Sequence, residues 1–238
     1  MADKLTARLM AAVLSSPVLS PVADRVLAPL WNRRNAALNE AALEALALSA
    51  EDRVLEVGFG GGYLLERMAS VVTRGLVAGV DVSPGMAARF GRRFGAETQS
   101  GRMDVRCAPA EDLPFEDGAF DKAVSVNSLF YWPDAAAGMR ELARVLAPGG
   151  RLVLCLTCRK CLENRLVGRV ARAWELDELL GLAIDTGFEI GSSERLADRH
   201  RLYWRLALTR SPGWETAPVT NGGSDRQTAH PDDAGCED

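Results

Sequence analysis

The sequence predicts an α/β fold: a mostly parallel sheet of seven strands covered by helices, with a helical cap before it and an antiparallel hairpin at its end. Three observations support this. Short apolar runs alternate with helical patterns between residues 53 and 157, as in chains that build parallel sheets. The first 50 residues are rich in Ala and Leu. The last two apolar runs are separated by only ADRH, which is too short for a parallel crossover.

The first predicted element is the helical cap, residues 1–50, where WNRRNAALNEAALEALAL has apolar residues at three- and four-residue spacing. Apolar runs then predict strands at 53–58, 76–82, 103–108, 120–127, 151–157, 188–196 and 201–209. The patterns between them predict helices at 62–72, 84–97, 134–147 and 174–187. Residues 51–210 are thus the predicted central domain. Residues 211–238, poor in apolar side chains, are expected to be a disordered acidic tail.

The composition is that of an ordinary globular protein, with 47% hydrophobic and 25% charged residues among 238. The net charge is -4, and the predicted tail holds six acids against Arg226. No basic stripe with interleaved aromatic residues is present, so a nucleic-acid partner is not expected. Ser and Pro interrupt the apolar stretch near Met10, which favours an amphipathic helix over a signal peptide and predicts no stable membrane insertion.

The first predicted strand ends in a glycine-rich segment, VLEVGFGGG, residues 54–62. Glycines between a strand and a helix let a ligand approach the backbone closely and point amide groups at it. The dinucleotide fingerprint G-x-G-x-x-G/A is incomplete, because Tyr63 stands where the third small residue is needed. A phosphate loop is excluded, since no Lys follows at the required spacing.

Two acids accompany the glycines. Glu56 precedes Gly58, Gly60 and Gly62 in the pattern E-x-G-x-G-x-G. A carboxylate there would repel a pyrophosphate and attract a cationic amino group. Asp81 closes the next predicted strand, the position from which an acid accepts hydrogen bonds from both ribose hydroxyls.

With these residues the sequence resembles the class I S-adenosylmethionine-dependent methyltransferases over about residues 50–210. The resemblance also includes the segments CAPAEDLPF, FDKAVSVNSLFYW and RVLAPGGRLVL. It looks closest to the small-molecule branch that includes the ubiquinone and menaquinone biosynthesis C-methyltransferases. It implies a Rossmann-like fold, S-adenosyl-L-methionine as cofactor, and a methyltransferase that modifies a small molecule.

The resemblance also implies where the cofactor lies. The glycine loop would pass under its methionine portion with Glu56 at the amino group, and Asp81 would hold the ribose. Asn127 would lie near the methyl-transfer face, and the other residues would surround the adenine or line the loop. The implied cofactor-binding residues are Glu56, Gly58, Phe59, Gly60, Gly62, Asp81, Val82, Met86, Ala110, Glu111 and Asn127. Pro109 departs from the family, whose members often carry Asp or Asn there, so the contact to the adenine amino group is lost or supplied by Glu111.

The predicted reaction is C- or O-methylation of an aromatic or quinone-like acceptor. No catalytic residue is assigned, because methyl transfer from a sulfonium needs orientation and exclusion of water rather than a strong catalytic constellation. His200, in the predicted hairpin, is either a base that reaches the pocket or an exposed turn residue. The [DN]-P-P-[YF] sequence of many nucleic-acid and protein N-methyltransferases is absent after Asn127, which lowers the odds of a nucleic-acid substrate.

Aromatic residues indicate where the acceptor binds. Phe130, Tyr131 and Trp132 follow the fourth predicted strand at its carboxyl end, where open α/β sheets bind ligands. Together with Trp31 in the helical cap, they are the predicted lining of an apolar substrate pocket. The alternative for each is that it packs under the following helix.

The five cysteines are an odd number, which indicates reduced thiols and a cytoplasmic protein. Cys155 is predicted in the core. Cys158 and Cys161 follow the same strand next to Arg159 and Lys160, which are expected to lower the thiol pKa. No metal site is predicted, because the C-x2-C-x2-C spacing lacks a nearby fourth ligand.

Two alternative functions stay open. One is a metalloid (arsenite-type) methyltransferase that uses Cys158 and Cys161. The other is a non-catalytic binding protein with the methyltransferase fold, which Pro109 keeps open. The sequence does not predict the oligomeric state.

Overall fold

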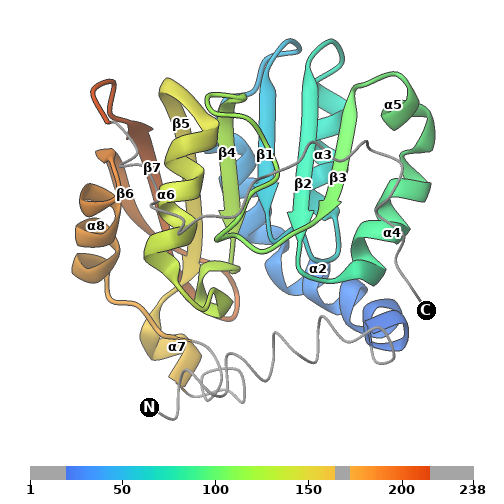
Figure 1. The fold of residues 1–238 in the computed structure, drawn as a ribbon. Helices are drawn as coiled ribbons and strands as arrows, with labels where there is room; N and C mark the ends of the chain where they lie inside the picture. Colours follow the sequence, from blue (N-terminus) through green and yellow to red (C-terminus); the bar gives the residue numbers. More distant parts are fainter. Residues whose placement is uncertain (1–19, 164–171, 215–238) are drawn as a thin grey trace, which may run out of the picture.

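The computed structural model describes residues 20–163 and 172–214, and their centre is a seven-stranded sheet (Figure 1). The strands are β1 (Arg53–Val57), β2 (Leu76–Asp81), β3 (Met103–Cys107), β4 (Phe120–Val126), β5 (Leu146–Thr157), β6 (Phe188–Ala197) and β7 (Leu202–Arg210). Their order in the sheet is β3-β2-β1-β4-β5-β7-β6. The predicted mostly parallel sheet is confirmed, as is the antiparallel hairpin at its edge.

The topology brings the carboxyl ends of β1 and β4 together. β1 pairs in parallel with both β2 and β4, so the chain leaves β1 towards one edge and later returns to its other side. A crevice at such a switch point is where open α/β sheets bind ligands. β7 runs antiparallel between β5 and β6, so the turn between β6 and β7 lies at this same carboxyl edge.

Helices cover both faces of the sheet (Figure 1). They are α2 (Ser20–Leu46), α3 (Tyr63–Val71), α4 (Pro84–Arg93), α5 (Gly95–Gln99), α6 (Ala135–Val145), α7 (Arg159–Glu163) and α8 (Leu176–Asp185), with the short 3-10 helix η1 (Leu129–Tyr131). The buried side chains form two clusters. One packs α6 and α8 on the sheet, and the other packs α2, α3 and α4 on the opposite face.

Strand β1 shows how one strand serves both clusters. Val54 belongs to the cluster under α2 and α3, whereas Leu55 and Val57 belong to the cluster under α6. Side chains alternate between the faces of a strand, so Glu56 shares the face of Val54. An acid therefore occupies a position that packing alone would give to an apolar residue.

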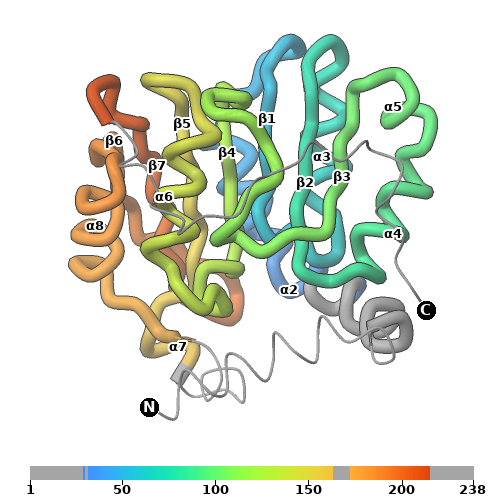
Figure 2. The backbone as a smooth tube through the Cα atoms, in the orientation of Figure 1, coloured from blue at the N-terminus to red at the C-terminus, as the bar shows by residue number. Residues whose placement is uncertain are grey.

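The chain path brings the first and the last described elements together. Helix α2 contacts β4, β5 and β7, so it lies along the sheet near the hairpin although it precedes β7 by more than 150 residues (Figure 2). Among residues 20–163 and 172–214, no helix has both the length and the apolarity needed to cross a bilayer.

Several element boundaries differ from the prediction. The helix predicted at 84–97 is divided into α4 and α5, and β5 begins at Leu146 rather than at Arg151. Helix α2 ends at Leu46, followed by Ala47 with a φ of +48°. The predicted domain boundaries stay predictions, and residues 1–19 and most of the predicted tail, 215–238, lie outside the described residues.

Candidate cofactor site at the carboxyl ends of the strands

The glycine loop, residues 58–62, connects β1 to α3. Gly58, Gly60 and Gly62 have φ values of +78°, +48° and +71°, in the left-handed region that glycine enters without steric cost. The loop also leaves no room for a larger residue at Gly58, because a Cβ there would lie 2.0 Å from Ser128 Oγ. A Cβ at Gly62 would lie 2.0 Å from Cζ of Phe90. Both conformation and contact therefore require glycine in this loop.

Glu56 lies just before the loop and is 3% exposed. Its carboxyl accepts a hydrogen bond from the backbone of Leu65, while Oε2 is buried with no hydrogen-bond partner. Burial, together with the nearby charge of Asp81, raises the pKa of the Glu56 carboxyl to about 8. A buried acceptor without a donor costs about 1–3 kcal/mol, so this oxygen is suited to a donor supplied by a ligand.

Asp81 ends β2 beside the loop and binds to it. Its Oδ2 accepts a hydrogen bond from the Gly60 N–H at 2.8 Å, and Oδ1 accepts one from the Ser83 N–H at 3.0 Å. A carboxylate has about four acceptor positions, so an acid held in this way also suits a diol. Glu56 and Asp81 thus lie on the adjacent strands β1 and β2, both near the start of the glycine loop.

The other predicted cofactor residues near the loop differ in exposure. Val82 is 36% exposed, whereas Phe59 and Met86 are 4% and 1% exposed and belong to the core under α2 and α3. Ala110 is also buried. Glu111 accepts a hydrogen bond from the Asp134 N–H at 3.0 Å, just before α6. Of Phe59, Val82, Met86 and Ala110, Val82 thus has by far the most exposed side chain.

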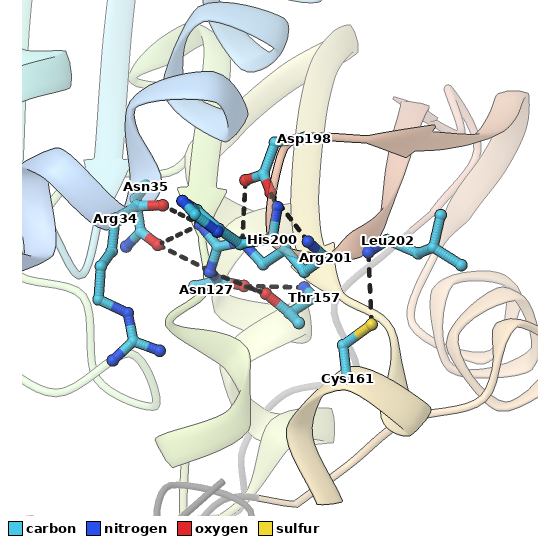
Figure 3. Close-up of polar contacts among 9 residues, drawn as sticks. All are labelled: Arg34, Asn35, Asn127, Thr157, Cys161, Asp198, His200, Arg201 and Leu202. Carbon is cyan, nitrogen blue, oxygen red and sulfur yellow. Dashed lines mark hydrogen bonds and ion pairs between the residues drawn. The ribbon is translucent and has the colours of Figure 1, made fainter. Parts of the chain in front are cut away.

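Asn127 follows β4 and has left-handed backbone, with a φ of +52°. Its Oδ1 accepts a hydrogen bond from the Thr157 N–H at 2.8 Å, and its Nδ2 donates to Asn35 Oδ1 at 2.9 Å (Figure 3). The next residue, Ser128, contacts Gly58. The structure thus places Asn127 beside the glycine loop, at the carboxyl ends of β1 and β4.

Comparison with known proteins identifies the family. Residues 55–154 match the family described as "Methyltransferase domain". A 27-O-demethylrifamycin SV methyltransferase of Amycolatopsis mediterranei is 32% identical over 200 residues, which are 77% of this chain and 73% of that protein. This chain belongs to the class I S-adenosylmethionine-dependent methyltransferases. The residues that predicted this family, Glu56 and Asp81 with the glycine loop, are those whose geometry is described above.

Other relatives match over less of their length. An O-methyltransferase of Aspergillus sclerotiorum is 30% identical over 61% of this chain and 58% of its own. A ubiquinone/menaquinone biosynthesis C-methyltransferase of Geotalea daltonii is 32% identical over 48% of each chain. The chain thus spans about half the length of these two relatives. The names of these relatives do not point to metalloid chemistry or to a non-catalytic role.

Solved structures confirm the fold. A SAM-dependent methyltransferase from Aquifex aeolicus superimposes with a TM-score of 0.60 at 19% identity, over 72% of this chain and 89% of its own. A second neighbour, described as the [4+2]-cyclase SpnF, has a TM-score of 0.64 at 22% identity over 76% of this chain. At these identities the likeness concerns the Rossmann-like fold alone.

The residues present fit S-adenosylmethionine, the cofactor of this methyltransferase family. The unpartnered Oε2 of Glu56 suits its ammonium group, and the three glycines with positive φ give a loop whose backbone a ligand can approach closely. Ser128 contacts the glycine loop, and the sequence did not predict this contact. Its Oγ accepts a hydrogen bond from Trp132 Nε1 at 2.9 Å and lies against Gly58. A serine after a strand carries no signal of such a contact, which depends on a glycine 70 residues earlier.

The predicted substrate residues are only partly accessible. Phe130 is 2% exposed and lies in the core, so the packing alternative describes it better. Tyr131 and Trp132 are half-buried, and burial raises the pKa of the Tyr131 phenol although the charge of Arg34 opposes this. Trp31 lies in α2, and its side chain is outside the described part of the chain.

The prediction that basic neighbours lower the thiol pKa is wrong for Cys158. Burial, and next the nearby Cys161, raises the pKa of the Cys158 thiol to about 11. Arg159 bonds instead to the Ala173 carbonyl at 2.8 Å and to Glu178 at 3.3 Å. Cys155 is fully buried, as predicted for a core residue. Within the described residues, no three His, Cys, Asp or Glu side chains gather where they could hold a metal.

His200 lies in the turn between β6 and β7 with an exposed side chain. Its backbone N–H donates to Asp198 Oδ1 at 2.7 Å, which shapes the turn. The other histidine, His230, is outside the described residues. The turn alternative therefore describes His200 in this structure.

A surface cavity of about 490 Å³ lies between α6 and α8. Asp134, Arg172, Trp174 and Glu178 are among its lining side chains. None of the predicted cofactor residues lines it, so it is separate from the site at the glycine loop.

Proposed function

We propose that this protein methylates a small aromatic or quinone-like molecule at carbon or oxygen, and that the glycine loop with Glu56 and Asp81 holds the S-adenosylmethionine. The observation that carries the proposal is the buried Glu56 carboxyl, whose Oε2 has no hydrogen-bond partner, beside three glycines with positive φ. The relatives' names add the acceptor class. They describe an O-methyltransferase, a rifamycin methyltransferase and a quinone C-methyltransferase.

The cofactor, when bound, supplies an electrophilic methyl carbon on a sulfonium. This chain's residues bind and orient. Glu56 would accept hydrogen bonds from the ammonium group, and Asp81 would accept them from the ribose hydroxyls. Val82, Met86, Ala110 and Glu111 would border the adenine, and Tyr131 with Trp132 would exclude water from the acceptor. Orientation and exclusion of water are the main contributions that an in-line displacement needs from a protein.

The Asp81→Ala variant tests the cofactor site. It removes the acceptor of both the predicted ribose bonds and the Gly60 N–H. Charge-assisted hydrogen bonds contribute about 1.5–3 kcal/mol, so affinity for S-adenosylhomocysteine in calorimetry should fall about tenfold or more. Asp104→Ala is the control, because Asp104 lies in β3 and pairs with Arg106. Equal affinity of Asp81→Ala and wild type would contradict the assignment.

The acceptor is found by incubating the protein with cell extract and a cofactor whose methyl group carries deuterium. Mass spectrometry should reveal a labelled aromatic or quinone-like product that is formed by the wild type and much reduced with Asp81→Ala. A labelled nucleic acid or protein, with no labelled small molecule, would contradict the proposed substrate class. Binding of S-adenosylhomocysteine without any labelled product would favour a non-catalytic binding protein.

A further inference from the structure

A cluster of buried and half-buried polar side chains joins four elements at the carboxyl edge of the sheet (Figure 3). We call it the Arg201 network, and it consists of Asn35, Asn127, Thr157, Asp198 and Arg201. These side chains come from α2, the end of β4, the end of β5 and the turn between β6 and β7. The network therefore closes the N-terminal helix and the C-terminal hairpin over the strand ends beside the cofactor site.

Arg201 is the centre of the network and is only 8% exposed. Its Nε donates to Asp198 Oδ2 at 3.2 Å, Nη1 to Thr157 Oγ1 at 3.2 Å, and Nη2 to Asn35 Oδ1 at 3.1 Å. Nη2 also donates to the Arg34 carbonyl. A planar guanidinium with five N–H groups is the side chain that satisfies so many acceptors from one fixed position. Asp198 compensates its charge.

These bonds fix which way the Asn127 amide points. The Thr157 backbone N–H can only donate, so the Asn127 atom 2.8 Å from it must be the oxygen. The opposite atom must be the nitrogen, because it faces Asn35 Oδ1, which already accepts from Arg201. A flipped amide would oppose N–H to N–H and oxygen to oxygen. Arg201 thus supports the orientation that the Thr157 N–H selects, because it holds the two other partners of the amide, Asn35 Oδ1 and the Thr157 hydroxyl.

One hydrogen of the fixed Asn127 amide has no bond among those described above. Its Oδ1 accepts from both the N–H and the hydroxyl of Thr157, at 2.8 and 3.1 Å, so its two lone pairs are engaged. One Nδ2 hydrogen goes to Asn35, and the amide carries a second. Asn127 therefore presents a hydrogen-bond donor, not an acceptor, next to the residue that packs on Gly58.

We propose that Arg201 is a positioning residue that holds Asn127 so that its second amide hydrogen is donated to an oxygen of the methyl acceptor. This rests on the proposed function. The acceptor is then an enol- or phenol-type molecule whose oxygen either takes the methyl group or lies next to the carbon that takes it. The new bond to the methyl carbon forms as the carbon–sulfur bond breaks, with its electron pair remaining on sulfur. The acceptor reacts as its enolate or phenolate, whose oxygen proton has passed to water beforehand, and in methylation at carbon the hydrogen displaced from that carbon passes to water afterwards. Asn127 gives up no proton in this step.

The chain offers a matched control for Arg201. Arg205 also lies in the hairpin and also connects it to α2, through the Ala41 carbonyl at 3.2 Å and Glu44 at 2.9 Å. It bonds to Glu194 as well and makes no bond to the Arg201 network. Arg201→Met and Arg205→Met should therefore both reduce the unfolding temperature, whereas only Arg201→Met should change Asn127.

The first measurement is NMR of the Asn127 side-chain amide, assigned by the loss of its signals in Asn127→Asp. In wild type and Arg205→Met, the hydrogen bonded to Asn35 should exchange slowly with solvent. In Arg201→Met its exchange should be about tenfold faster or more, as expected for loss of charge-assisted bonds. Fast exchange in the wild type, or equal effects of the two variants, would overturn the positioning role.

The second measurement uses the labelled product found with deuterated cofactor. Arg201→Met should lower kcat about tenfold or more while changing the affinity for S-adenosylhomocysteine less than about threefold, and Arg205→Met should change neither to that extent. Arg201→Lys should not rescue kcat, because an ammonium cannot replace the fork. An unchanged kcat in Arg201→Met overturns the donor role. Failure to find any labelled product overturns that role together with the proposed function, while the exchange result stands by itself.

Discussion

The two halves of the carboxyl edge are built in different ways. At the ends of β1 and β2, the glycine loop is shaped by positive φ values and is bonded through a backbone N–H, that of Gly60, to Asp81 on the adjacent strand. At the ends of β4 and β5, Asn127 is held by side chains 92 and 30 residues away, and Arg201 reaches back 166 residues to Asn35. The first half depends on backbone conformation that few residues allow. The second distributes its energy over several side chains, so its single substitutions should have smaller effects.

The largest effect is expected from Gly62→Ala, in the backbone-built half. The new Cβ would lie 2.0 Å from the Phe90 ring, at a φ of +71°. Phe90 is 1% exposed and packs edge-on against Phe59, so it cannot move aside cheaply. Overpacking and the left-handed backbone should together cost about 2–4 kcal/mol of unfolding free energy and abolish measurable binding of S-adenosylhomocysteine. Urea unfolding and calorimetry measure the two effects.

Gly91→Ala is the matched control for that substitution. Gly91 follows Phe90 in α4, and a Cβ there would meet nothing within 4 Å. Replacing a helical glycine of this kind should stabilise the protein by about 0.5–1 kcal/mol and leave binding unchanged. If Gly62→Ala behaved like Gly91→Ala, the loop would not depend on its backbone conformation, and the contrast between the two halves would be lost.

This contrast also explains what the sequence could predict. The parallel sheet, its hairpin and the positions of Glu56, Gly60 and Asp81 follow from patterns within a few residues. The exposure of Phe130 and the thiol pKa of Cys158 were less predictable, because both depend on packing from distant elements. The Arg201 network was not predictable at all. The turn ADRHR has the same composition whether Arg201 points into solvent or towards Thr157 and Asn35.

Glu56→Gln should have the next largest effect, on the pH dependence of binding. The folded, unbound protein keeps Glu56 protonated up to about pH 8, whereas the unfolded chain releases this proton near 4.5. The unbound wild type should therefore lose stability as pH rises from about 4.5 to 8. Binding an ammonium group requires the ionised carboxylate, so wild-type affinity for S-adenosylhomocysteine should rise up to about tenfold per pH unit between about pH 6 and 8.

In Glu56→Gln both slopes should disappear, and affinity at pH 8 should fall about tenfold or more because the charge-assisted bonds are lost. Calorimetry in buffers of different ionisation enthalpy counts the proton released on binding. Glu116→Gln, at an exposed carboxylate, should behave like the wild type. Equal pH slopes in Glu56→Gln and wild type would show that Glu56 does not meet the amino group.

The smallest effect is expected from Thr157→Val, in the half held by side chains. The change keeps the β-branched shape but removes a hydroxyl that donates to Asn127 Oδ1 and accepts from Arg201. The Thr157 N–H still bonds to Asn127, so the loss should be about 1–2 kcal/mol of unfolding free energy, with cofactor affinity changed less than about threefold. Thr186→Val is the control, because the buried Thr186 hydroxyl bonds to the Leu182 and Ala183 carbonyls at the end of α8. Both variants should lose similar stability, but only Thr157→Val should shift the Asn127 amide signals. A collapse of cofactor binding in Thr157→Val would mean that this half is as intolerant of a single change as the glycine loop.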